Sequence, residues 1–151
     1  MSKEQVLHRL EQEWQAFLKS VEGLPESVLL EAGVCGEWSI RDLMAHVPTW
    51  EEETLRALPL IQKGKRTPKY STLYGGIDAF NALQHTRKKS LSLAQVKRDL
   101  KSTHKRLEAF LADLPETAFT YRLVRRLGLD TYNHYREHRE QIEEGRKGKS
   151  L

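Results

Sequence analysis

The sequence predicts an all-α protein, a bundle of four main helices with one or two short extra helices. Long segments repeat their apolar residues every three or four positions, which is the period of one face of an α-helix. Nowhere does the chain alternate apolar and polar residues over the length that a β-strand needs. A length of 151 residues fits one domain, so we expect a single core.

The first predicted helix occupies the N-terminal segment. Its apolar residues follow alternating spacings of three and four and are Leu7, Leu10, Trp14, Phe17 and Val21. Gly23 and Pro25 stop this pattern, so the helix is expected to end before them. A short helical turn is expected over residues 26–31, and glycines mark a loop over residues 33–36.

The second long helix begins with a start signal at Ser39. The Ser39 side chain is placed to accept hydrogen bonds from the first turn, and Asp42 adds negative charge near the positive end of the helix dipole. Pro48 lies inside this helix, where it removes a backbone hydrogen bond and is expected to cause a kink. The apolar stripe of the helix comprises Ile40, Leu43, Val47, Trp50, Thr54 and Leu58.

The middle of the chain is predicted to hold the longest loop. Residues 63–76 contain glycines and a proline with little periodicity, which is typical of an irregular connection. Loops of this length in compact domains are often lids or pocket walls. A helix is expected to follow over residues 77–89.

Two further long helices are predicted after residue 91. Ser92 is the N-cap of the first, and apolar residues then repeat over residues 93–114. Residues 117–127 are ambiguous. The glycine and aspartate in residues 128–130 are expected to introduce the final helix, over residues 131–145.

Composition and charge argue against some classes of protein. With 25 basic and 21 acidic residues, the net charge of +4 is a small, interspersed excess. Basic clusters at residues 63–66, 87–89, 122–126 and 146–149 show no sign of converging on one face, so a nucleic-acid partner is not expected. No signal peptide or membrane span is recognisable, so we expect a cytoplasmic protein without a membrane partner. The single cysteine, Cys35, agrees with a reducing compartment.

Two histidines of the final predicted helix, His134 and His138, are the main candidate site residues. Their spacing of four puts both imidazoles on one helical face, where they can reach a common metal ion. His46, at the rim of the second helix's stripe, would complete three ligands and leave positions open for water or substrate. The spacing alone also fits ordinary core histidines, and imidazole ligands do not choose between zinc, nickel, iron and copper. The remaining histidines are assigned to the surface: His8, His85 and His104.

The sequence around these histidines resembles the DinB/YfiT-like superfamily. Residues 38–46, which read Trp-Ser-Ile-Arg-Asp-Leu-Met-Ala-His, are similar with the following Trp50 and Glu51 to its N-terminal signature. Segments 77–81 and 91–92 resemble a subgroup of these proteins. Three residues of the final helix are similar to the C-terminal signature: His134, His138 and Gln141.

This resemblance, which covers nearly the whole chain, implies both a fold and a metal site. It implies up-down-down-up connectivity for the four-helix bundle, in one DinB-like domain over residues 1–151. It also implies a divalent metal, zinc or nickel first, held by histidines that match His46, His134 and His138. A homodimer is suggested by the resemblance alone.

The resemblance also implies a set of reactions on a small-molecule substrate. Its members include enzymes that transfer low-molecular-weight thiols such as bacillithiol or mycothiol, an isomerase that uses mycothiol, and hydrolases. The leading hypothesis is a metal-dependent thiol S-transferase or hydrolase that acts on a small electrophile in detoxification or stress response. The alternative is a non-catalytic self-protection protein that binds a small molecule between its helices.

Candidate catalytic and pocket residues follow from these hypotheses. The possible bases are Asp42, Glu53 and Glu137, of which Asp42 is more readily a helix cap or a partner of an imidazole. Cys35 lies in the loop before the second helix, and without an identified base we interpret it as an inert small residue. The pocket candidates are Trp38, Trp50, Asn81, Tyr135 and Gln141.

Overall fold

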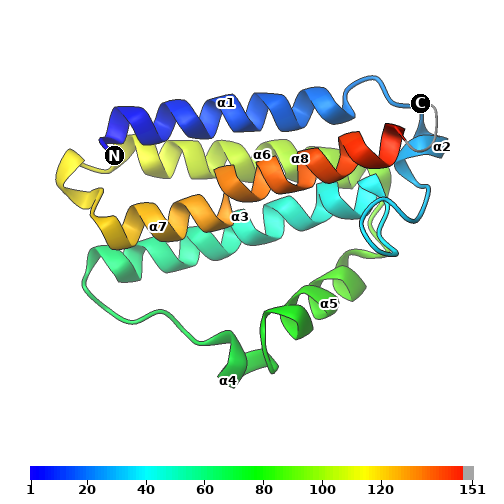
Figure 1. The fold of residues 1–151 in the computed structure, drawn as a ribbon. Coiled ribbons are helices and arrows are strands. Elements are labelled where there is room, and N and C mark those ends of the chain that lie inside the picture. Colours follow the sequence, from blue (N-terminus) through cyan, green and yellow to red (C-terminus); the bar gives the residue numbers. More distant parts are fainter. Residues whose placement is uncertain (148–151) are drawn as a thin grey trace.

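Four long helical elements form the bundle in the computed structural model, which describes residues 1–147. They are α1 (Lys3–Val21), α3 (Ile40–Gln62), α6 (Leu93–Asp113), and α7 (Tyr121–Asp130) followed directly by α8 (Tyr132–Lys147). Helix α1 and the α7–α8 pair run in one direction, and α3 and α6 run in the other (Figure 1). The predicted fold class, an all-α bundle with up-down-down-up connectivity, is confirmed. Residues 148–151 of the expected domain, with Lys149 of the basic tail, lie outside the described residues.

A crossover joins the two neighbouring helices that run in the same direction, α3 and α6. It contains α4 (Tyr70–Tyr74) and α5 (Ile77–Lys88), which lie along the outside of the bundle (Figure 1). The prediction of one loop over residues 63–76 is wrong for α4. The rings of Tyr70 and Tyr74 pack at 5.1 and 4.9 Å from the ring of Phe80, so contacts with α5 stabilise a turn that the local sequence does not indicate.

Two short elements complete the chain, α2 (Glu26–Leu29) and the 3₁₀-helix η1 (Glu116–Ala118). Residues 1–147 form no β-strand, although an isolated bridge joins Cys35 and Trp38 just before α3. Within the same residues, no helix combines the length and the apolar character needed to cross a bilayer.

Helix α3 begins where the start signal predicts. The Ser39 hydroxyl accepts from the Asp42 amide at 3.1 Å, and the Asp42 carboxylate accepts from the Ser39 amide at 3.0 Å, which is a reciprocal capping box. The helix continues through both Pro48 and Pro59 to Gln62. Every member of the stripe predicted for this helix is buried: Ile40, Leu43, Val47, Trp50, Thr54 and Leu58.

The fourth long element begins earlier than predicted. Thr120 caps α7 by accepting from the Leu123 amide at 3.3 Å, so Gly128 and Asp130 lie inside a helix and do not introduce one. A Cβ at Gly128 would lie 2.8 Å from the Tyr132 hydroxyl, so the close packing of this tyrosine explains a glycine within the helix. The backbone of Thr131, at φ −124° and ψ −94°, interrupts the helix between α7 and α8.

One residue assigned to the surface lies in the core. His104 on α6 is 2 % exposed, and its ring stacks on Trp14 of α1 with 3.7 Å between centroids. A buried imidazole needs polar partners, and Glu51 of α3 and Tyr135 of α8 supply them. The assignment of His104 to the surface is therefore wrong, because its partners come from three other helices and leave no local signal.

Candidate metal centre

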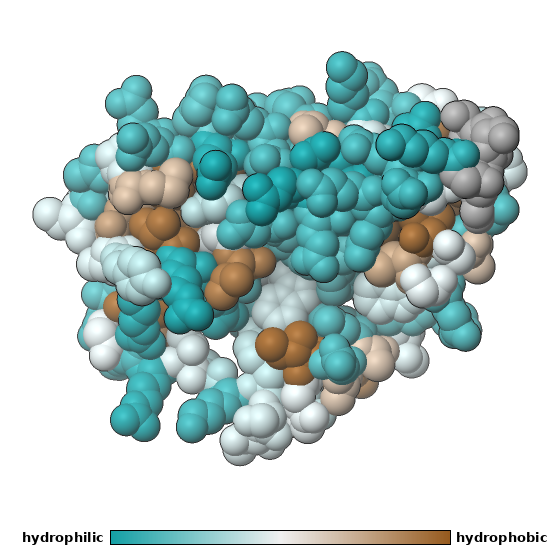
Figure 2. Space-filling view, viewed as in Figure 1, coloured by the Kyte–Doolittle hydropathy of each residue, from teal (hydrophilic) through white to brown (hydrophobic). Residues whose placement is uncertain are grey.

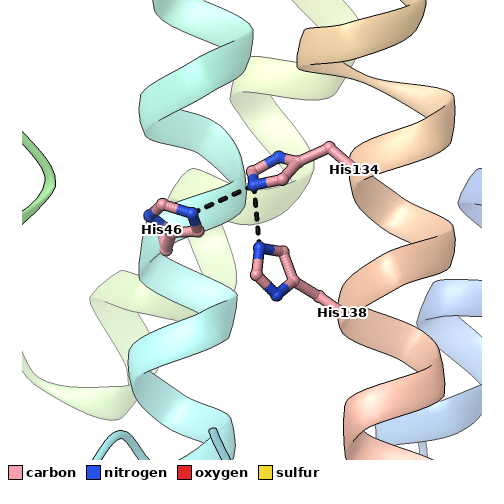
Figure 3. A group of neighbouring side chains, drawn as sticks. All are labelled: His46, His134 and His138. Atoms are coloured by element: carbon pink, nitrogen blue, oxygen red, sulfur yellow. Dashed lines mark hydrogen bonds between the residues drawn. The ribbon is translucent and has the colours of Figure 1, made fainter. Parts of the chain in front are cut away.

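Three imidazoles converge between α3 and α8. His46 reaches inward from α3, and His134 and His138 come from successive turns of α8 (Figure 3). The Nε2 atom of His134 lies 3.0 Å from Nε2 of His46 and 2.8 Å from Nε2 of His138. The structure thus brings together the three histidines that the sequence and the resemblance select, each offering the same ring nitrogen to a common point.

Hydrogen bonding around the rings favours a cation at that point. His138 Nδ1 lies 2.7 Å from the Gln141 side-chain oxygen, so Nδ1 carries the hydrogen and Nε2 presents a lone pair. His134 Nε2, which carries at most one hydrogen, faces two nitrogens at once. If all three rings are neutral and His134 Nε2 has no hydrogen, its lone pair faces the lone pair of His138 Nε2. If it has one, that single N–H must donate to both His46 and His138. A divalent ion accepts all three lone pairs.

The spacing of the nitrogens fits a metal ion. Two imidazole nitrogens at about 2.0 to 2.1 Å from one ion lie about 2.9 Å apart at a right angle and about 3.4 Å apart at the tetrahedral angle. The observed separation of 3.0 Å lies at the short end of this range, and that of 2.8 Å lies slightly below it. Small rotations of the rings are therefore sufficient to accommodate an ion.

The electrostatic environment keeps these imidazoles neutral. Burial lowers the pKa of His46 to about 3, with further lowering by His138, Lys88 and His85. Burial, followed by the two neighbouring histidines, holds the pKa of His134 well below its usual value. Burial also lowers the pKa of His138, although Gln141 and Glu137 act in the opposite direction. Neutral imidazole is the form that binds metal.

A cavity with a volume of about 520 Å³ opens beside the three histidines. It lies between the bundle and the α4–α5 crossover, where the surface is hollowed (Figure 2). Its rim includes two exposed apolar side chains, Ile77 at 52 % and Leu129 at 58 % exposure. The rest of its lining, apart from the histidines, is Trp50, Tyr70, Asn81, Arg126, Asp130 and Glu137.

Two of the five predicted pocket residues line the cavity, and the other three lie outside its lining. Trp50 and Asn81 line it, and the indole N–H donates to the Asn81 side-chain oxygen at 2.9 Å. Trp38 packs its ring edge-on 5.0 Å from His46, and Gln141 orients His138. Tyr135 is fully buried on another face of α8 and donates to Glu51, so its assignment to the pocket is not supported.

The three candidate bases have different surroundings. Asp42 is engaged in the capping box and lies 3.3 Å from His85. Glu53 is bound by Arg56 and by the Tyr70 hydroxyl and is absent from the lining of the cavity. Glu137, an exposed residue one position before His138, lines the cavity. Of the three, Glu137 is the only carboxylate that lines the cavity.

Asp42→Asn is expected to destabilise the protein in a pH-dependent way. Burial raises the pKa of this carboxyl, but hydrogen bonds from Ser39 and the charge of His85 outweigh it, so the pKa is lowered. Because the pKa of Asp42 is lower in the folded state, its ionised carboxylate stabilises the folded protein at pH values above the usual pKa of 3.8. This stabilisation is lost as the pH falls through the folded-state pKa. We expect a loss of about 0.5 to 1 kcal/mol at pH 7.

Urea denaturation at pH 7 and at pH 3 measures the effect, with the exposed Asp113→Asn as the control. A difference between Asp42→Asn and the wild type that stays constant on acidification would contradict this account.

Five residues that line the cavity are absent from the sequence-based predictions of the site: Tyr70, Ile77, Arg126, Leu129 and Asp130. Arg126 donates to Asp130 at 2.6 Å and to the Tyr70 hydroxyl at 3.0 Å, which links α7 to α4. Residues 117–127 are ambiguous in the sequence and residues 63–76 are predicted as loop, so the predicted fold gives Arg126 and Tyr70 no defined position. The i, i+4 spacing of Arg126 and Asp130 is a signal that would have indicated a helix there.

The surroundings of Cys35 disfavour its thiolate form. Burial, with a smaller effect of Glu137, raises the pKa of its thiol, and the reactive thiolate is therefore disfavoured. This agrees with the interpretation of Cys35 as an inert residue.

Comparison with known proteins places this arrangement in context. The model of the DinB superfamily matches residues 9–142. No curated protein matches the sequence. The colibactin self-resistance protein ClbS, solved with double-stranded DNA, is similar in structure with a TM-score of 0.81 and 15 % identity, over 97 % of this chain and 96 % of its own.

Two further solved structures have the same fold. An uncharacterised protein from Escherichia coli UTI89 gives a TM-score of 0.81 at 14 % identity, over 99 % of this chain and 95 % of its own. A protein from Streptococcus pneumoniae gives 0.74 at 16 % identity, over 97 % and 91 %. At these identities the likeness concerns the fold.

Proposed function

This chain belongs to the DinB superfamily, and we propose that it is a divalent-metal protein that captures a small electrophilic compound beside His46, His134 and His138 and inactivates it. The observation that carries the proposal is the convergence of three Nε2 atoms at one edge of an open cavity of about 520 Å³. Three protein ligands leave positions for water or substrate, which distinguishes catalytic from structural metal sites. The reaction class is S-transfer from a low-molecular-weight thiol, or hydrolysis.

The side chains around the cavity have distinct roles in this proposal. His46, His134 and His138 would hold a divalent ion, which would act as a Lewis acid and lower the pKa of a bound water or thiol. Gln141 holds His138 in the tautomer that presents Nε2. Trp50 and Ile77 offer apolar surface to the compound. The Glu137 carboxylate, which lines the cavity, would accept the proton that the attacking water or thiol releases.

Sequestration without turnover is the second candidate function. ClbS, which shares the fold, is a self-resistance protein. The exposed apolar rim formed by Ile77 and Leu129 is suited to holding a compound with apolar surface. This function predicts tight binding that is stoichiometric and releases no product.

Assays of metal content and turnover separate these functions. Elemental mass spectrometry is applied to protein purified without a histidine tag or chelator, and again after reloading with zinc or nickel. Metal-loaded and metal-free protein are then incubated with a chromogenic electrophile and a panel of thiols, and with chromogenic esters. We expect acceleration by the metal-loaded form alone. Binding of a compound without turnover would favour sequestration, and failure to retain any metal would remove the metal-dependent reaction.

Glu137→Gln is expected to lower kcat by about 100-fold or more, because it removes the proton acceptor and keeps the shape of the side chain. Metal content is expected to stay unchanged, since the carboxylate is not one of the three ligands. Glu140→Gln, an exposed glutamate of the same helix, is the matched control. Equal kcat values for the two variants would show that the base lies elsewhere.

The partners need separate tests. ClbS was solved with DNA, so electrophoretic mobility of duplex DNA at low salt is worth measuring, and we expect it to be unchanged by this protein.

The homodimer suggested by the resemblance stays a prediction, and light scattering during size exclusion measures the mass directly.

A further inference from the structure

We propose that the protein carries a second divalent-cation site, formed at the seam between α1 and α6 by Glu11, His104 and Glu108. Glu11 comes from α1, and the other two residues lie one turn apart on α6. One nitrogen or oxygen from each residue lies within 4.8 Å of the other two. The site is separate from His46, His134 and His138 and shares no ligand with them.

The His104 ring is held in one orientation. It stacks on Trp14 with an interplanar angle of 6°, and its Nδ1 lies 2.6 Å from Glu51 Oε2. The same oxygen accepts from the Tyr135 hydroxyl. A carboxylate oxygen accepts hydrogen bonds, so Nδ1 carries the ring hydrogen and Nε2 presents a lone pair. This is the carboxylate–histidine arrangement that commonly supports metal ligands in proteins.

The lone pair of His104 Nε2 is not satisfied by the protein. The atom is buried and has no hydrogen-bond partner among residues 1–147. It faces Glu108, whose Oε1 lies 3.6 Å away. Glu11, the other carboxylate of the set, accepts from the Gln15 amide at 2.9 Å, which restrains its position. A lone pair directed at carboxylates is unfavourable unless a positive charge lies between them.

A divalent cation meets this requirement. One imidazole and two carboxylates are a ligand set that zinc accepts. Two ligands at about 2.1 Å from zinc are about 3.4 Å apart at the tetrahedral angle, close to the 3.6 Å between His104 Nε2 and Glu108 Oε1. Glu11 and Glu108 are exposed, so water can complete the coordination. A proton on His104 Nε2 would also place positive charge between the imidazole and the carboxylates. Binding of zinc to this site distinguishes a cation site from a protonated histidine.

The test uses a protein in which the histidine triad is removed. His46→Ala/His134→Ala is titrated with zinc by calorimetry, after circular dichroism has shown that it is folded. We expect one bound zinc ion. Adding Glu108→Gln is expected to weaken this binding at least tenfold, because it removes an anionic ligand from an exposed position without disturbing the His104 ring. Adding Glu144→Gln, at an exposed position on α8, is the control and is expected to change nothing.

Cobalt provides a second readout. We expect the visible absorption of Co²⁺ bound to the triad-deleted protein to disappear with Glu108→Gln and to persist with Glu144→Gln. Absence of zinc binding to the triad-deleted protein, or equal zinc affinity of the two glutamine variants, would overturn the proposal. The single variant Glu108→Gln keeps all three histidines of the triad, so its metal content tests the proposed function independently.

Discussion

His134→Ala is expected to reduce the affinity of the triad for a divalent ion by more than about 100-fold. Loss of a group that only orients a metal ligand typically costs 10- to 100-fold, so loss of a ligand costs more. His134 is the central member, because its Nε2 faces the corresponding atoms of both His46 and His138. The variant keeps only His46 on α3 and His138 on α8, and it lacks the His134 Nε2 atom that lies next to both of them.

Competition with a chromogenic chelator measures the affinity of wild type and variant for zinc and nickel. His8→Ala, which removes an exposed histidine from α1, is the control and is expected to leave the tight site intact. His134→Ala is also examined together with Glu108→Gln, which removes the second proposed site, and tight metal binding that persists in this double variant would mean that the three nitrogens do not share an ion. Circular dichroism checks that these variants are folded.

Glu51→Ala is expected to lower the free energy of unfolding by about 3 to 5 kcal/mol. Glu51 is fully buried, and its Oε2 atom is the shared partner of His104 Nδ1 and the Tyr135 hydroxyl. Removing the carboxyl leaves both groups without this partner in the core and also creates a cavity. For a chain of this length the expected decrease in Tm is about 6 to 20 °C.

The adjacent Glu52→Ala is the matched control. Glu52 is 39 % exposed in its side chain and lies 3.5 Å from Arg106, a surface pair worth at most about 1 kcal/mol. Urea denaturation of the two variants measures the difference. A loss for Glu51→Ala no greater than that for Glu52→Ala would show that the buried network does not stabilise the fold.

The helices that the sequence predicted well are those whose signals are local. The capping pair of Ser39 and Asp42 and the stripe of α3 lie within one segment, so periodicity and cap chemistry located them. The spacing of His134 and His138 is likewise local to one helix. The pairing of these residues with His46 depends on how α3 packs against α8, and the resemblance supplied that information.

The features that the sequence did not indicate depend on contacts between distant segments. His104 reads as a surface residue because its partners, Trp14, Glu51 and Tyr135, lie on three other helices. Tyr70 belongs to α4, which is held by aromatic contacts across the crossover. Periodicity along one segment carries no information about such pairs.

The histidines and one wall of the cavity belong to different parts of the fold, and this separation bears on how new specificities arise. The metal-ligand candidates lie on α3 and α8, whereas Tyr70, Ile77 and Asn81 come from the crossover. In that part of the described chain, α4 has no buried residue and α5 has one, Phe80. Under the proposed function, an exchange of the crossover between relatives would alter the range of compounds admitted and leave the three histidines in place, which makes this segment a target for grafting and directed evolution.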